Sequence, residues 1–211
     1  MSRRRDTFRT LLSRCVRQDT GSVAVEVGLL AGVFVMLLGG GLEAGMALHA
    51  KNEAFQAARH GARVAATSSP VATDMLTMTG LGGGAVAGDP LPAFDITCSG
   101  RTRSCSQGGF DAAAMNTLLW GPNASSCRTS AGRHAQGMCN FGVSSLDNIS
   151  IRYRSSGLGR VGSPADPMPI ITVSVVDKTH DWIFLERLLG DTSTLAPVEA
   201  TVVSENLGKA L

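Results

Sequence analysis

The sequence predicts an α+β protein in which a long N-terminal helix carries a small antiparallel β-sheet head with short helices. Three observations lead to this fold class. Residues 23–42 form an apolar run of twenty residues with one charge, residues 43–66 are rich in alanine and lack proline, and the last third of the chain has three runs rich in β-branched residues. About 20 apolar residues match the hydrocarbon core of a membrane, and alternating β-branched runs are typical of half-buried strands.

The first 21 residues form a basic leader. They hold six arginines against two aspartates, a net charge of +4, which leaves −2 for the rest of a chain whose formal charge is +2. The arginines are Arg3, Arg4, Arg5, Arg9, Arg14 and Arg17. A basic segment before an apolar one usually stays cytoplasmic, so we expect residues 43–211 to be exported. The near-neutral total gives no indication of nucleic-acid binding, although the basic tail alone could bind an acidic partner.

The apolar run is predicted to be a transmembrane helix in contact with lipid. It is longer than the apolar region of a secretory signal, which has roughly 7–15 residues. Small residues near Ala47 still leave open a signal peptidase cut there, with a mature chain that starts near Lys51. A buried helix of a soluble protein is disfavoured, because uninterrupted apolar runs of this length are rare in soluble cores.

The helical pattern continues beyond the apolar run, so one helix is predicted over residues 22–66. At 1.5 Å per residue it would be roughly 65 Å long, half in the membrane and half projecting as a stalk. Small residues recur along the stalk at spacings of three and four, namely Ala47, Ala50, Ala54, Ala57, Gly61 and Val64. Two glycine pairs, Gly28 with Gly32 and Gly41 with Gly45, have a spacing of four nearer the N-terminus. Such positions either let another helix or a sheet approach closely or simply reflect common helix residues, and the sequence leaves both open.

Residues 67–211 are predicted to form the head. Residues 68–109 and 121–147 are rich in polar and turn-forming residues and are predicted to be loops, separated by a helix over 111–119 that Asp111 caps. Three strands are predicted in "NISIRYRS" (148–155), "PIITVSVVD" (169–177) and "PVEATVVSE" (197–205). Between the last two, "HDWIFLERLLGD" places Trp182, Leu185, Leu188 and Leu189 at helical spacing.

The cysteines predict disulfide bonds in an oxidising compartment. Cys15 lies in the leader, and the other four lie in the part predicted to be exported. Of three possible pairings, Cys98–Cys105 with Cys127–Cys139 is favoured because it closes two short loops. A metal site of Cys127, His134 and Cys139 is the competing interpretation, but its spacing fits no standard zinc pattern.

Catalytic patterns are not found in the sequence, which predicts no enzyme, no cofactor and no metal. There is no HExxH, GxSxG, Walker or GxGxxG motif, and "GLGGGAVAG" lacks the Lys-Ser/Thr of a phosphate loop. His180 and Asp181 are too close on the chain for the geometry of a catalytic triad, so His180 is expected to be a surface or capping residue. An anchored periplasmic enzyme is therefore the least favoured class of function.

The order of the N-terminal features resembles a known family. A basic leader, Gly21, four residues, Glu26 and an apolar helix are similar to the class III signal peptide of type IV pilin-like proteins. "DTGSVAVEVGLL", then Glu43-Ala-Gly45 and "QAARHGAR", resemble TadE-like proteins, minor pseudopilins of the Tad (tight adherence, or Flp) pilus. The resemblance covers about residues 17–66. Val27 stands where the family usually has Phe or Tyr, and the family's proline in the apolar span is missing, which predicts a straighter helix.

The resemblance implies a function and a site. In this family a prepilin peptidase would cut after Gly21 on the cytoplasmic side, leaving a new amine on Ser22 and Glu26 at the fifth position. This glutamate is expected to pair with the N-terminal amine of a neighbouring subunit, because an unpaired charge in lipid is costly. The implied partners are other pilins or pseudopilins, the Tad secretion machinery and the peptidase.

The resemblance also implies a location and a role. The protein would lie in the bacterial inner membrane with a periplasmic head, and its incorporation in the pilus is left open. Because the major pilins of this system are very short, a head of this size implies a minor component. The alternative is an uncleaved single-pass protein whose periplasmic head binds a ligand or adheres to a surface.

Overall fold

The computed structural model describes residues 19–81, 84–127, 136–162, 167–182, 186 and 192–204. The chain divides into two compact units. One consists of Met1–Met46 and Trp182–Asp191, and the other of Ala47–Asp181 and Thr192–Leu211. The first unit contains the apolar part of the long N-terminal helix. The second, called the head unit below, contains the sheet and the last part of that helix.

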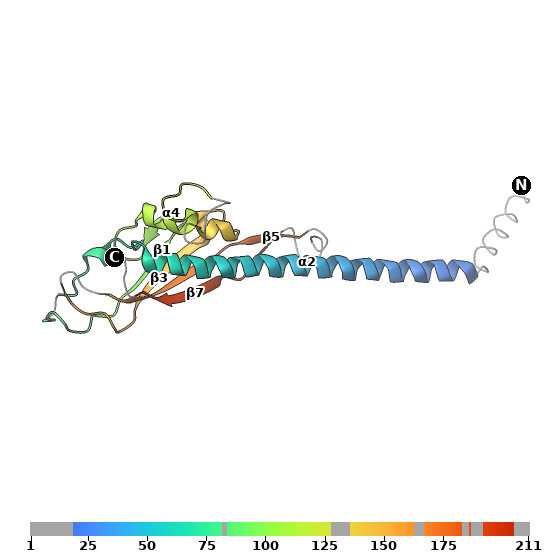
Figure 1. The fold of residues 1–211 in the computed structure, drawn as a ribbon. Coiled ribbons are helices and arrows are strands. Elements are labelled where there is room, and N and C mark those ends of the chain that lie inside the picture. Colours follow the sequence, from blue (N-terminus) through green and yellow to red (C-terminus); the bar gives the residue numbers. More distant parts are fainter. Residues whose placement is uncertain are drawn as a thin grey trace, which may run out of the picture. The chain divides into compact units, whose positions relative to one another are not determined.

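The helices and strands follow in chain order with the labels of Figure 1. The α-helices are α2 (Asp19–Thr67), α3 (Asp74–Thr77) and α4 (Ala112–Trp120). Two 3₁₀-helices are η2 (Met138–Phe141) and η3 (Leu146–Asn148). The strands are β1 (Asp95–Ser99), β2 (Ser104–Cys105), β3 (Ile149–Ser155), β4 (Pro169–Val175), β5 (Thr179–Asp181), β6 (Thr192–Thr194) and β7 (Val198–Val203). A long apolar helix followed by a small antiparallel sheet and short helices confirms the predicted α+β class.

The main sheet has the order β2-β1-β3-β4-β7, and every neighbouring pair is antiparallel. Its register aligns residues of like polarity across the strands. Ile96, Tyr153, Ile171 and Val202 form one row, and Cys98, Ile151, Val173 and Ala200 form the next. Because side chains alternate between the two faces of a strand, this register gives the sheet one apolar and one polar face.

The apolar face of the sheet forms the core of the head unit together with the end of α2 and with α4. The buried residues from α2 are small, and those from α4 are larger. They are Ala54, Ala57, Ala58, Ala62 and Ala65 on α2, and Ala114, Met115, Leu118 and Leu119 on α4. Small side chains let the backbone of α2 lie close to the sheet, and α4 contributes larger side chains to the same core. Figure 1 shows the end of α2 running alongside the strands.

The polar face carries hydrogen bonds and an ion pair. Thr172 and Thr201 are 3.0 Å apart between their hydroxyl oxygens, and the Ser174 hydroxyl donates to Glu199. Arg152 on β3 donates from Nε to Asp95 Oδ1 on β1 at 2.7 Å and also binds Oδ2. These cross-strand pairs fix the register on the side that α2 and α4 do not cover.

Several predicted elements are confirmed. The alternation of Ile149, Ile151 and Tyr153 in β3 places all three at 0 % exposure. The predicted helix 111–119 is α4, and the Asp111 carboxylate caps it by accepting from the backbone N–H groups of Ala113 and Ala114. The three predicted strands of the last third are β3, β4 and β7.

The loop predicted over residues 68–109 is wrong in part. It contains α3 and strands β1 and β2, and β1 pairs with β3 over five residues. Only Ile96 and Cys98 are buried in β1, so its apolar signal is two residues long and lies between turn-forming residues. The strand therefore depends on pairing with β3, which is remote in sequence.

The second predicted loop and the predicted second short helix have different outcomes. The loop predicted over residues 121–147 contains η2, and η3 begins at its end. Most of the helix predicted in "HDWIFLERLLGD" lies outside the described residues. His180, expected just before it, lies in β5, which pairs with β6 in a separate two-stranded sheet.

Candidate functional site

The N-terminal segment that carries the motif is helical. Gly21, Ser22 and Glu26 all lie in α2, which begins at Asp19. Residues four apart share one face of a helix, so Ser22 and Glu26 lie on the same face, one turn apart. The Glu26 side chain is exposed. The backbone therefore places the predicted cleavage site slightly more than one helical turn before the glutamate.

The apolar part of α2 exposes large hydrophobic side chains. Leu29, Phe34, Met36 and Leu37 are between 62 % and 77 % exposed. Among the described residues, one helix is long and apolar enough to cross a membrane, and its most apolar window has a mean hydropathy of 2.2. Exposure on this scale is costly in water, whereas lipid removes that cost.

The four glycines of the apolar part have open surroundings. A Cβ atom built on Gly28, Gly32, Gly41 or Gly45 would meet no side chain or remote backbone atom within 4 Å in the described part of the chain. None of the described residues therefore packs closely against these glycines. The two interpretations of their spacing, a surface for another helix or common membrane-helix residues, therefore both stay open for this part of α2.

Glu43 is another carboxylate of α2, and it is completely buried. It lies one residue after the end of the 23–42 run, and neighbouring Gly39 on the same helix face is also buried. Sequence reasoning used Glu43 only as part of Glu43-Ala-Gly45 and assigned it no role. Acidic residues are rarely buried completely, so the burial of Glu43 marks it as a residue of interest. The sequence pattern alone did not reveal this burial.

The stripe of small residues along the stalk, from Ala47 to Val64, belongs to the head unit. Ala54, Ala57 and Gly61 are buried, whereas Ala47 and Ala50 are half-buried. A Cβ on Gly61 would come to 2.6 Å from Met138 Sδ and 3.2 Å from Val173 Cγ1. The Ala50 carbonyl accepts a hydrogen bond of 3.3 Å from Lys178 Nζ. The stripe therefore allows close approach of the sheet, which is one of the two interpretations that the sequence left open.

The segment "QAARHGAR" divides into two faces. Ala57, Ala58 and Ala62 face the core, while Arg59 and Arg63 are exposed. His60 lies at the border, where its Nε2 is 2.7 Å from the carbonyl oxygen of Gln136. This alternation of small and basic residues attaches the helix to the sheet and at the same time presents cations to the solvent. Sequence reasoning assigned no role to His60.

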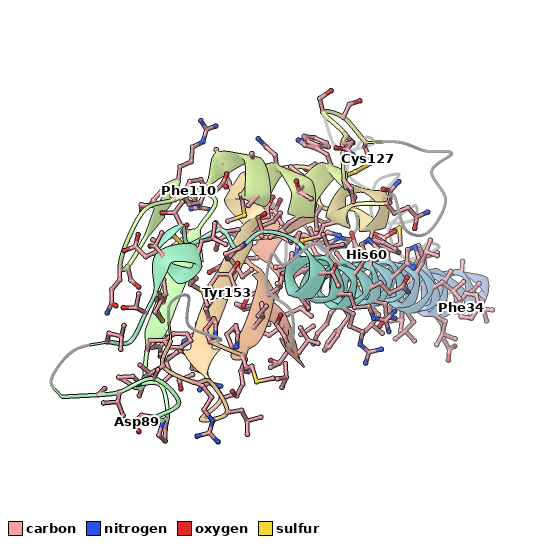
Figure 2. The ribbon with its side chains drawn as sticks, turned by 60° about the vertical axis from the view of Figure 1, so that its left-hand side comes forward. Phe34, His60, Asp89, Phe110, Cys127 and Tyr153 are labelled. Atoms are coloured by element: carbon pink, nitrogen blue, oxygen red, sulfur yellow. A yellow bond between two sulfur atoms is a disulfide. The ribbon has the colours of Figure 1, made fainter. Side chains whose placement is uncertain are left out.

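A groove adjoins His60. It has a volume of about 860 Å³ and is lined by Gln56, His60, Arg63, Val64, Thr67, Gln136 and Phe141. The rings of His60 and Phe141 lie 5.2 Å apart between centroids, and Figure 2 shows His60 on the side of α2 nearest Cys127. The groove has one cationic side chain and no carboxylate in its lining.

Both predicted disulfides are present. Cys98 on β1 is bonded to Cys105 on β2, directly opposite in the register, and Cys127 is bonded to Cys139 in η2. Cys139 and Cys127 are therefore not free thiolates for the metal site considered with His134, which lies outside the described residues. The described residues contain no group of three or more His, Cys, Asp or Glu side chains that could hold a metal ion.

Three groups in the head unit have shifted pKa values, and one of them is Arg152, whose pKa is raised by its hydrogen bond to Asp95. The hydrogen bond from Arg152 lowers the pKa of Asp95. Burial raises the pKa of Tyr153. The backbone N–H of Val71, which donates to the Tyr153 hydroxyl, acts in the opposite direction and lowers this pKa. The three shifts arise from the Arg152–Asp95 pair on the sheet and from the burial of Tyr153 in the core.

A helix of this length and polarity, with its last part packed on a small sheet, defines a class of membrane-anchored proteins with a folded head. Residues 21–63 match the family described as TadE-like protein. The match confirms the resemblance seen in the sequence, and it begins at Gly21 and ends at Arg63. No curated protein and no solved structure matches the chain.

Proposed function

We propose that the chain is a minor pseudopilin-like structural component of Tad/Flp pilus assembly, and that a prepilin peptidase processes it after Gly21. The observation that carries the proposal is the family match over residues 21–63, which contains the Gly21–Glu26 spacing and the "QAARHGAR" segment. The N-terminus would be cytoplasmic, and the head would lie in the periplasm. The partners would be other pilins or pseudopilins and the secretion machinery.

The geometry of α2 supports this role in two ways. Its apolar part presents glycines with open surroundings, which suits lateral packing against other transmembrane helices. Its first turns place the amine that cleavage would create one turn from Glu26. A carboxylate in a membrane costs free energy unless it is paired, so pairing with an amine would favour one axial register between subunits over the others.

Processing is tested by expressing the full chain with a prepilin peptidase and determining the intact mass and N-terminal sequence of the membrane-extracted protein. We expect a mature chain that begins at Ser22. Gly21→Ala should block the cut. The matched change Gly28→Ala, seven residues later in the same helix, should leave the cut unaffected. A start near Lys51 would indicate a secretory signal, and an intact Met1 would indicate the uncleaved anchor with a binding head.

The role of Glu26 is tested separately from cleavage. Glu26→Ala and Glu26→Gln should both be cleaved, but both should assemble poorly, because neither variant can pair with the amine as a charge. Glu26→Asp keeps the charge and should retain part of the assembly. Normal piliation with Glu26→Gln would contradict the pairing role while leaving the processing result intact.

A further inference from the structure

The two edges of the main sheet differ in length and in protection. The β2 edge is two residues long and is held by the Cys98–Cys105 disulfide. The β7 edge is six residues long, and its pairing with β4 runs through six consecutive residue pairs without a bulge. Val198–Val203 contains no proline and no lysine, two residues that commonly protect an edge, and its one charged residue is Glu199.

The register shows which backbone groups of β7 point away from the sheet. The Ser204 N–H donates to the Pro169 carbonyl at 3.0 Å, so this pair is hydrogen-bonded. Hydrogen-bonded pairs alternate along an antiparallel ladder, which directs the N–H and C=O groups of Val202 and Ala200 toward β4. The corresponding groups of Val203, Thr201 and Glu199 therefore point outward. No other strand of the described chain pairs with this edge.

A cationic groove runs beside the same edge. It has a volume of about 270 Å³ and is lined by Arg59, Ala62 and Arg63 from α2 and by Ala200, Thr201 and Val202 from β7. Arg59 stacks over the Phe55 ring, with its guanidinium carbon 5.8 Å from the ring centroid. Within the described part of the chain, neither Arg59 nor Arg63 forms an ion pair. Among the described residues, the two cations of the groove therefore have no acidic partner.

We propose that β7 and this groove together bind an extended segment of a partner protein, which adds to the sheet as a sixth strand and places acidic side chains against Arg59 and Arg63. A strand added at this edge lies about 4.8 Å from β7 and would use the outward backbone groups of Thr201 and its neighbours. Every second side chain would face α2, where the groove is. Alternation therefore selects a segment with an acidic residue at every second position. This inference goes beyond the proposed function and does not depend on cleavage after Gly21.

The binding test uses the full-length protein in detergent and a short capped peptide of alternating threonine and glutamate that carries a fluorescent label. We expect fluorescence anisotropy to show saturable binding, with weak or no binding of the matched threonine–lysine peptide. In an extended peptide the threonine amides point to one edge of the strand and the glutamate amides to the other, so only one set faces β7. N-methylation of that set should abolish binding, and N-methylation of the other set should not. Binding insensitive to both would overturn strand addition.

Variants of the protein separate the edge from the charge. Thr201→Pro removes an outward N–H without removing a bond to β4, and we expect peptide affinity to fall about three- to tenfold or more. Thr201→Val keeps the N–H and should bind as the parent does. Because Thr201→Pro could disturb folding, Arg59→Glu with Arg63→Glu provides the second arm. That variant should reverse the preference and bind the threonine–lysine peptide.

Three other results would contradict the proposal. If Arg59 and Arg63 only shield the edge, their replacement by alanine would increase peptide binding or aggregation. If a second copy of this chain occupies the edge, light scattering would show a concentration-dependent dimer that Thr201→Pro abolishes and that the peptide does not displace. Binding of glutamate peptide that survives Thr201→Pro unchanged would reduce the site to a nonspecific charge attraction.

Discussion

Tyr153 is the only tyrosine of the chain, and it connects the start of the head to the sheet. It lies on β3 with 0 % exposure, and Figure 2 shows it among the strands. Its hydroxyl accepts a hydrogen bond of 3.0 Å from the backbone N–H of Val71, just after the end of α2. A buried hydroxyl needs such a partner, and the Val71 N–H would be unsatisfied without it.

We expect the protein to lose stability in alkali because of Tyr153. Burial raises the pKa of Tyr153 in the folded state. The folded protein thus binds the phenolic proton more tightly than the unfolded chain, so the contribution to stability is fully present below about pH 10 and is lost as the pH rises beyond it. Thermal unfolding followed by circular dichroism across this range would measure the fall.

Tyr153→Phe is the matched variant for this measurement. It should lower the free energy of unfolding at neutral pH by about 1–3 kcal/mol, because the Val71 N–H loses its partner. It should also remove the Tyr153 part of the alkaline fall. Thr97→Val removes an exposed hydroxyl from the same sheet and should change neither quantity appreciably. Equal alkaline profiles for Tyr153→Phe and the parent protein would refute the assignment.

At the scale of elements, the contact between α2 and the sheet depends on small side chains. Gly61 lies where a Cβ would press on Met138 and Val173, whereas Gly45 on the same helix has open surroundings. Glycine in a helix costs roughly 1 kcal/mol relative to alanine, so its presence at 61 needs a packing reason. The close contact with Met138 and Val173 supplies that reason.

We expect Gly61→Val to destabilise the head by about 1–3 kcal/mol, because overpacking forces Met138 and the sheet to move. Gly61→Ala should cost less, since the Met138 side chain can shift and alanine favours the helix. Gly45→Val is the control and should leave the thermal unfolding of the head unchanged. A stabilised Gly61→Val protein would show that the contact between α2 and the sheet is loose.

The sequence predicted elements with long or regular patterns and missed those made by remote pairing. The 49 residues of α2 and the alternation in β3 have signals that local residues alone determine. Strand β1 has two buried residues, and its formation depends on five pairs with a strand some fifty residues away. The motif residues, namely the glycines and Glu26, could be identified from the sequence. The burial of Glu43 and the groove beside β7 could not be predicted, because both arise from the tertiary structure.

At the scale of the whole molecule, two disulfides close two short loops of the head unit. Cys98–Cys105 has a sequence separation of 7 and Cys127–Cys139 one of 12. In the chain-entropy model, loops of these lengths contribute about 2.5 and about 3 kcal/mol to stability. The first bond fixes the short edge of the sheet, and the second joins the segment after α4 to η2.

We expect Cys127→Ala with Cys139→Ala to lower the free energy of unfolding by about 3 kcal/mol, and Cys98→Ala with Cys105→Ala to lower it by a similar amount. Cys15→Ser should have no effect on the head. Thiol titration of the native protein should find these four cysteines unreactive, and mass spectrometry of an unreduced digest should give the two pairs. Four reactive thiols in the native protein would refute both bonds.

The order of the chain also sets the timing of folding during synthesis. The Ala66 carbonyl accepts a hydrogen bond of 2.9 Å from the Ser204 hydroxyl, 138 residues later, and Val198 of β7 belongs to the same core as Ala54 of α2. The small-residue face of the helix is made early but acquires its complete cover only after residue 204 has left the ribosome. Until then the nascent head exposes apolar surface, and this exposure favours aggregation in the interval before the chain is complete.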